Sequence, residues 1–240
     1  MKEGKCLTLL PAALIAAGIA LAGYFASQTL YNAKVALNTA EAKGLAERRV
    51  TADRANWTVY FQVSGKSRDD VPQLYKDAER QQGVIMQLLK DEGLPENEMK
   101  TGIIDYSSKE YRDEDQKIVD EKHWLTGSIS VETENVEIIE KLRGSVNKLI
   151  AQGYDITNRP ASYHFTKLND VKPEMLKEAA KNARIAANEF ADNAGVKVGR
   201  IRSATQGAFF VVDIGESHGD TRKIEKNVRV VTRIEFYLSK

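Results

Sequence analysis

A run of twenty residues without a charged side chain lies near the beginning of the chain, from Leu7 to Ala26, with the sequence LTLLPAALIAAGIALAGYFA. Twenty residues of α-helix rise about 30 Å, the thickness of the hydrocarbon core of a bilayer. Lys2 and Lys5 precede the run, and positive charges favour the cytoplasmic side of a membrane. The run therefore predicts a single-pass anchor, with the amino terminus inside and the following residues outside.

Two other readings of the same run stay open. A cleaved signal peptide usually has an apolar stretch of about 7 to 15 residues, shorter than this one, although Ala20-Leu21-Ala22 offers a small-x-small cleavage site. A buried core helix is the other alternative. Cys6 precedes the apolar run, whereas a lipoprotein cysteine would follow it. It is the only cysteine, so the exported part is expected to hold no disulfide and to perform no thiol chemistry.

The chain is expected to divide into a cytoplasmic tail over residues 1–6, the transmembrane anchor over 7–26, a polar linker over 27–43 and one folded domain over 44–240. Its 35 Lys and Arg residues nearly balance its 34 Asp and Glu residues. This balance gives no electrostatic reason to expect a nucleic-acid partner.

Periodicity predicts the fold of the exported part. Residues 50–64 predict a strand with Trp57, Val59 and Phe61 on one face. Three helical stripes follow along the chain, and each ends at a glycine and precedes a strand. The expected order is β-α-β-β-α-β-α-β-β after the transmembrane helix. Strands joined by hairpins and separated by helices predict an α+β domain, a mainly antiparallel sheet with helices on one face.

No group of residues has the spacing of a catalytic or metal site. The SGKS sequence of residues 64–67 fails as a phosphate loop, because Tyr60 stands where the first glycine of that motif belongs. His123, His164 and His218 are isolated and form no His-x-x-x-His pair. We therefore expect no cofactor, no metal and no local catalytic motif.

The loop GESHGD, residues 215–220, contains the residue types of a nucleophilic triad in Ser217, His218 and Asp220. Triads are usually assembled from separate elements, because neighbours on one loop rarely hold the required hydrogen-bond geometry. A plain hairpin loop is therefore the favoured reading.

The stretch FTKLNDVKPEM, residues 165–175, joins a short strand to a long helical pattern. Asn169 or Asp170 can accept hydrogen bonds from the free amides of a helix start. Pro173 has a backbone angle suited to the first turn. Capping therefore explains this junction without chemistry, and the helix is expected over residues 173–194.

The same junction begins a longer resemblance. The segment FTKLNDVKPEMLKEAAKNARIAANEFADNAGVKVGRIRSATQGAF, together with AKGLAERRVTADRANW and IEKNVRVVTRIEFYL, resembles bacterial SIMPL-domain proteins. The resemblance covers about residues 44–238, and the apolar segment followed by GYFASQTLYNAK is similar to a membrane-anchored subgroup. It implies a cell-envelope location, mostly periplasmic, and a loose association with oxidative-stress defence. It supplies no catalytic residues.

Two function classes result. The first is a non-enzymatic protein of the inner (cytoplasmic) membrane with a periplasmic binding or assembly domain, an unknown envelope protein as partner, and self-association through an edge strand at residues 232–238. The second is a hydrolase-like periplasmic enzyme whose site is assembled from distant residues, with Asn169, Asp170, Arg184 and Gln206 as candidates. A deep pocket holding several of these four would favour the enzyme, and a flat surface would favour binding.

Overall fold

The chain folds as an α+β protein in the part that the computed structural model describes, residues 4–35 and 38–239, which confirms the predicted class. The helices are α1 (Gly4–Val35), α2 (Val71–Asp91), α3 (Ile138–Ala151) and α4 (Leu168–Asn193). The strands are β1 (Thr39–Thr51), β2 (Arg54–Gly65), β3 (Met99–Thr101), β4 (Asp105–Arg112), β5 (Ile118–Thr133), β6 (Ile156–Asn158), β7 (Ser162–His164), β8 (Lys197–Asp213) and β9 (Glu225–Ser239).

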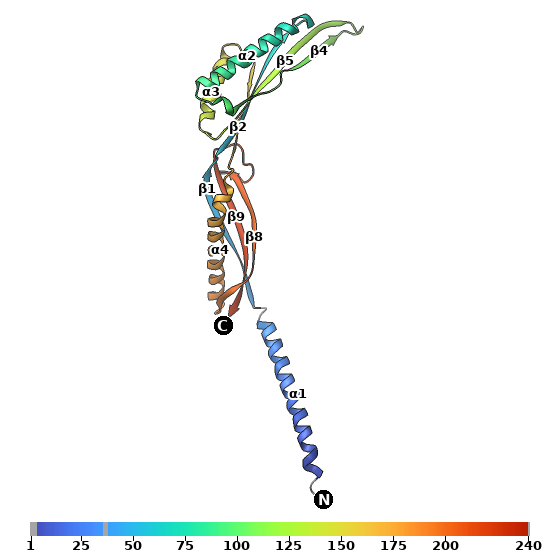
Figure 1. The fold of residues 1–240 in the computed structure, drawn as a ribbon, viewed down its shortest axis with the longest axis vertical. Coiled ribbons are helices and arrows are strands. Elements are labelled where there is room, and N and C mark those ends of the chain that lie inside the picture. Colours follow the sequence, from blue (N-terminus) through green and yellow to red (C-terminus); the bar gives the residue numbers. More distant parts are fainter. Residues whose placement is uncertain (1–3, 36–37, 240) are drawn as a thin grey trace. The chain divides into compact units, whose positions relative to one another are not determined.

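The strands form two sheets, where the sequence predicted one. The three-stranded sheet has the order β1-β9-β8, and the six-stranded sheet has the order β3-β5-β2-β6, with β4 beside β5 and β7 beside β2. The chain divides into two compact units: unit 1 comprises residues 1–46, 173–209 and 230–240, and unit 2 comprises residues 47–172 and 210–229. Figure 1 shows α4 along β1, β8 and β9, and α2 and α3 along β2 and β5.

The core of unit 2 lies between the six-stranded sheet and its two helices. β2 and β5 pair antiparallel from Ala55↔Thr133 to Gly65↔His123. Trp57, Val59 and Phe61 are buried on the same face of β2, as the sequence predicted. The apolar stripes of α2 and α3 are also buried and complete this core. Side chains alternate between the two faces of a strand, and α2 and α3 both pack on the face that holds Trp57, Val59 and Phe61. We refer to the opposite face of β2 and β5 as the open face.

Unit 1 has a much smaller core, in which α4 lies unusually near the sheet. The buried face of α4 is mainly alanine, namely Met175, Ala179, Ala183, Ala187 and Ala191. Ala42 of β1 and Ile234 and Phe236 of β9 pack against it. A β-carbon on Gly44 would overlap the carbonyl oxygen of Ala179. The helix and β1 therefore approach each other so closely that only glycine fits at position 44.

Several element boundaries differ from those predicted. β1 begins at Thr39, inside the segment expected to be a linker, and the single strand expected over residues 50–64 is divided between β1 and β2. β1 presents Ala42, Gly44 and Ala46 to α4. Alanine and glycine have low strand propensity, which hides the period-2 pattern in the sequence.

Two further expectations about the carboxy-terminal part are corrected. Residues 232–238 belong to β9, which lies in the middle of the three-stranded sheet. The prediction of an edge strand at these residues is therefore wrong. The edge strands of this sheet are β1 and β8. α4 begins at Leu168, so Pro173 lies inside the helix and does not start it.

The helix α1 contains a segment that is long and apolar enough to cross a membrane. Ala13–Ala33 is a 21-residue segment with a mean hydropathy of 1.5, and none of it is buried. The segment fits a single-pass anchor or a signal peptide. Lys2, on which the orientation argument partly depends, lies outside the described residues, and so does the side chain of Cys6.

Candidate binding surface

The open face of the six-stranded sheet carries a continuous row of uncharged polar and aromatic side chains. The alternation that buries Trp57, Val59 and Phe61 turns the residues between them to this face. β5 follows the same rule, because Leu125, Ile129 and Val131 are buried and their neighbours are not. We call the row the uncharged stripe; its members are Thr58, Tyr60, Gln62 and Ser64 of β2 and Trp124, Thr126, Ser128 and Ser130 of β5.

The register of β2 and β5 places these side chains directly opposite one another. Thr58 pairs with Ser130, and their hydroxyl oxygens are 3.3 Å apart. The guanidinium carbon of Arg159 lies 4.9 Å from the centre of the Tyr60 ring. Trp124 is half-buried at the other end of the stripe, opposite Ser64. The stripe thus offers hydroxyl and amide groups along its length and one indole ring near its end.

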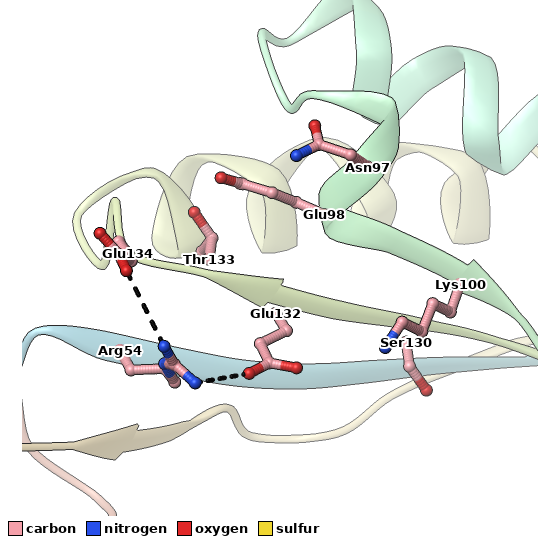
Figure 2. A pocket seen from close by; sticks show the side chains of 8 residues that line it. All are labelled: Arg54, Asn97, Glu98, Lys100, Ser130, Glu132, Thr133 and Glu134. Atoms are coloured by element: carbon pink, nitrogen blue, oxygen red, sulfur yellow. Dashed lines mark hydrogen bonds and ion pairs between the residues drawn. The ribbon is translucent and has the colours of Figure 1, made fainter. Parts of the chain in front are cut away.

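A hollow of about 300 Å³ lies at the Ser130 end of the stripe (Figure 2). Its lining comes from β2, from β5 and its end, and from the turn that leads into β3: Arg54, Asn97, Glu98, Lys100, Ser130, Glu132, Thr133 and Glu134. Figure 2 shows the Arg54 guanidinium directed at two carboxylates, with Nη1 2.9 Å from Glu132 Oε1 and Nη2 3.8 Å from Glu134 Oε1. Because Arg54 is already paired, this hollow is poorly suited to a simple anion.

A second hollow, of about 470 Å³, lies at the Ser64 end of the stripe. It is lined by Ser64, Gly65, Lys66, Tyr111, Asp120, Glu121 and Lys122. Its charged side chains are again of both signs. Along β2 and β5, the open face therefore has a hollow with opposed charges at each end and uncharged side chains between them. The neighbouring strands border this stretch with Lys100, opposite Ser130, and Asp105, opposite Thr126.

The covered face holds a different polar group, at His123. The Tyr106 hydroxyl lies 2.7 Å from His123 Nδ1, and His123 Nε2 lies 3.4 Å from Glu121 Oε2. His123 lies on β5 and is buried. No motif in the sequence indicates its contact with Tyr106, because that contact depends on the pairing of β4 with β5. Tyr106 lines neither of the two hollows.

Beneath the GESHGD loop lies a fully buried ion pair between Asp213 and Lys226. Lys226 Nζ is 2.5 Å from Asp213 Oδ1 and also donates to the Asp220 carbonyl at 2.7 Å. Burial by itself raises the pKa of Asp213, but hydrogen bonds from Lys226 and from the amides of Arg222 and Lys223 outweigh it and hold that pKa below its usual value. The pair fixes the ends of the loop.

The loop itself does not form a triad among the described residues. Ser217 Oγ and His218 Nδ1 are 2.9 Å apart, but both side chains are exposed. The backbone carbonyl of Asp220 accepts a hydrogen bond from Lys226. In the described residues, no hydrogen bond joins the Asp220 carboxylate to His218. The hairpin-loop interpretation fits this arrangement.

The four candidate residues from the sequence do not gather at one place. Asn169 and Asp170 lie in the first turn of α4, where Asn169 Oδ1 accepts a 2.8 Å hydrogen bond from Lys172. Arg184 donates to the Gly199 carbonyl at 3.0 Å and lies 5.1 Å from the centre of the Phe236 ring. Gln206 is exposed on β8. Two belong to unit 2 and two to unit 1, and none lines either hollow of the open face.

The part of the chain that the structure describes contains no group of three or more His, Cys, Asp or Glu side chains arranged to hold a metal ion. The acidic residues of the two hollows instead lie among basic ones.

Comparison with known proteins identifies a family. The family model SIMPL, a protein of unknown function (DUF541), matches residues 41–229. No curated protein matches the chain. Among solved structures, a similar chain is the crystal structure of an unknown protein from Galdieria sulphuraria, with 9% sequence identity over 76% of this chain and 83% of that chain. The TM-score of that pair is 0.14, which supports no structural conclusion.

Proposed function

The chain belongs to the SIMPL family, and we propose that it is a membrane-anchored member whose exported domain binds a partner in the cell envelope without catalysing a reaction. The anchor is α1, with its amino terminus in the cytoplasm, and the domain that follows lies in the periplasm. A link with oxidative-stress defence is implied by the family resemblance alone.

The single observation that carries the anchor is the exposure of α1. Leu14, Ile15 and Ile19 are 68%, 64% and 68% exposed, and Phe25 and Leu30 are 64% and 69% exposed. Apolar side chains that are not buried in protein are stabilised by leaving water, at roughly 25 cal/mol per Å². A bilayer provides that environment for a whole helix, whose backbone polar groups are already hydrogen-bonded internally.

The test combines an intact mass with a topology reporter. We expect the mature chain to keep residues 13–33, to remain in the membrane pellet after alkaline carbonate extraction, and to show a carboxy-terminal reporter as active only outside the cytoplasm. A soluble mature chain that begins shortly after Ala22 would show that the segment is a cleaved signal. A reporter active in the cytoplasm would reverse the orientation.

Binding, in place of catalysis, is supported by the open face. The uncharged stripe is extended and shallow, and the residues proposed for an assembled active site are divided between the two units. Small-molecule active sites are usually concave and enclose their ligand. An extended face suits a partner that is itself extended.

Self-association is a separate part of the proposal. In the three-stranded sheet, the edges available for it are those of β1 and β8, since β9 is central. Edge strands expose amides and carbonyls that can pair with another chain. Light scattering on the full chain in nanodiscs is expected to give more than one copy per particle; a monomer at high micromolar concentration would count against it.

A further inference from the structure

We infer that the uncharged stripe of unit 2 binds an extended, uncharged polyhydroxyl chain, that is, a neutral glycan. The inference rests on the proposed binding function and names the chemical class of the ligand. It starts from the side chains of the stripe, which are hydroxyl, amide or aromatic groups in a chain of which 29% is charged. Hydroxyls and amides both donate and accept hydrogen bonds, as the hydroxyls of a sugar do.

The dimensions of the stripe fit a chain better than a single sugar. Thr58 to Ser64 covers six residue steps of strand, which is about 20 Å at roughly 3.3 Å per residue. The two hollows, of about 300 and 470 Å³, continue the face beyond both ends of the stripe. A ligand lying along the strands would thus meet uncharged groups in the middle and enter a hollow at either end.

Trp124 gives the stripe a flat apolar surface. Its indole is half-buried near the Ser64 end. Aromatic rings combine a broad apolar face with a polar edge, and the C–H face of a sugar ring is apolar while its rim is hydroxylated. Tyr60 differs, because the Arg159 guanidinium already lies over its ring. Trp124 is therefore the position at which stacking contributes most.

Other partner classes fit this face less well. Nucleic acids require a row of cations along the phosphate backbone, whereas the charges that border the stripe are of both signs: Lys100 opposite Ser130, Asp105 opposite Thr126, and Arg159 over Tyr60. A second sheet packs through apolar inner faces, which a row of Ser, Thr and Gln does not provide. Added peptide strands pair with sheet edges, whereas β2 and β5 are bonded to neighbours on both sides. Lipid surfaces require an apolar or a basic face.

The test uses the full chain in lipid nanodiscs, which avoids detergents with sugar headgroups. The probes are chitohexaose, maltohexaose and, as an anionic counterpart, hexagalacturonate. Calorimetry and tryptophan fluorescence are measured together. The chain has two tryptophans, and Trp57 is buried in the core, so a fluorescence change on binding is expected from Trp124. We expect at least one neutral hexasaccharide to bind and the anionic one to bind far more weakly. The two neutral probes distinguish an acetylated amino sugar from a plain hexose polymer.

Two variants with matched controls assign the binding to the stripe. Trp124→Ala is expected to weaken affinity about five- to tenfold, the size of one lost aromatic contact. Trp124→Phe is expected to restore affinity without the fluorescence change. Thr126→Asp, which puts a carboxylate in the stripe, is expected to abolish binding. The controls are Tyr75→Ala on α2 and Thr205→Asp on β8, both at exposed positions, and both are expected to bind as the native chain does.

The inference is overturned if no neutral hexasaccharide binds at millimolar concentration, or if Trp124→Ala and Thr126→Asp bind unchanged. A photo-crosslinking amino acid at position 128, introduced in cells, separates this failure from failure of the proposed function. If sugars do not bind but position 128 crosslinks a protein, the glycan inference is wrong and the binding function stands. If neither sugars nor a crosslinked protein are found, both proposals fall.

Discussion

The open face of the three-stranded sheet carries charged side chains paired across neighbouring strands, whereas the open face of the six-stranded sheet carries the uncharged stripe. In unit 1, Glu41 Oε1 lies 3.1 Å from Arg233 Nε. Arg202 Nη1 lies 2.6 Å from Glu235 Oε1. In unit 2, β2 and β5 carry an ion pair of this kind, Arg54 with Glu132, at the end of the stripe. The stretch of β2 and β5 between the two hollows holds Ser, Thr, Gln, Tyr and Trp. The same chain thus builds two sheets with contrasting exposed chemistry.

Sheet formation therefore does not determine which side chains an open face carries. Exposed ion pairs contribute little to stability, about 0 to 1 kcal/mol each, so the charged face of the three-stranded sheet is an ordinary solvated surface. Nothing in strand pairing prevents the same pattern in unit 2. The proposed binding of a neutral ligand would account for the uncharged stretch, whereas folding would not.

The largest effect is expected from the buried ion pair between Asp213 of β8 and Lys226 of β9. Lys226→Met leaves the buried Asp213 carboxylate without its partner. Removing one member of a buried pair costs about 3–5 kcal/mol, to be measured by urea unfolding at pH 7. Lys223→Met, at an exposed lysine, is the control and is expected to change stability by less than about 1 kcal/mol. Equal stabilities of the two variants would contradict the structural role of the pair.

The pH dependence of the same pair gives a second readout. Because hydrogen bonds hold the pKa of Asp213 below its usual value in the folded state, its stabilisation is fully present above about pH 4. It is lost as the pH falls through the folded-state pKa. In Lys226→Met the lowering by Lys226 is lost while the amides of Arg222 and Lys223 remain, so the pKa of Asp213 rises relative to that in the native chain. The stability difference between the native chain and the variant is therefore expected to shrink in acid.

The next effect in size tests the contrast between the two cores. Gly44→Ala forces a β-carbon against the Ala179 carbonyl of α4, and overpacking of this kind costs about 1–3 kcal/mol. Gly83→Ala is the matched control, because a β-carbon there meets nothing within 4 Å on an exposed position of α2. It is expected to stabilise the chain by about 0.5–1 kcal/mol, from helix propensity. A Gly44→Ala chain as stable as the native one would show that α4 can shift freely.

A smaller effect is expected from the charged open face. Hydrogen bonds from Thr39 and Arg202 hold the pKa of Glu235 below its usual value despite partial burial. Its contribution to stability is present above about pH 4.3 and is lost as the pH falls through the folded-state pKa. Glu235→Gln should lower the melting temperature slightly at pH 7 and at low salt, and the two chains should converge at pH 3. A difference that persists at pH 3 would show that the charge is not its cause.

The smallest effect is expected from a charge placed in the stripe. Thr126→Asp places a carboxylate directly opposite Asp105 of β4. Because like charges at paired positions destabilise a sheet, we expect a loss of about 0.2–1 kcal/mol in the free energy of unfolding. A melting temperature close to that of the native chain, together with lost glycan binding, would confirm that the lack of charge in the stripe serves ligand binding. A strongly destabilised Thr126→Asp chain would instead mean that folding excludes charge there, and the comparison between the two faces would lose its force.

Strong local signals made part of the fold predictable. The alternation of Trp57, Val59 and Phe61 correctly identified a buried strand face. The helix-ending glycines were also identified correctly, since Gly93, Gly153 and Gly195 have φ of 101°, 94° and 68°. Left-handed backbone at these positions is cheap only for glycine, so the signal is specific.

Features that depend on packing were not predictable. β1 was missed because its buried residues are small, and their meaning appears only when α4 lies on them. The start of α4 was placed five residues late, because Pro173 was taken as a first-turn residue. Asp170 is therefore inside the first turn, and its substitution should act mainly through the helix dipole. The stripe was missed because each of its residues is ordinary and only the β2–β5 register brings them together.

The order of the strands also determines when each unit can fold. Most of unit 2 comes from one continuous stretch, residues 47–172, whereas unit 1 combines stretches from both ends of the chain. Thr39 of β1 bonds to Glu235 of β9 across 196 positions of sequence. Chains are made from the amino terminus onward, and domains form as their residues emerge. β1, which follows α1 in the chain, can therefore pair with β9 only after almost the whole chain has been synthesised. Closure of unit 1 is thus a long-range step of folding, and it requires a chain synthesised through β9.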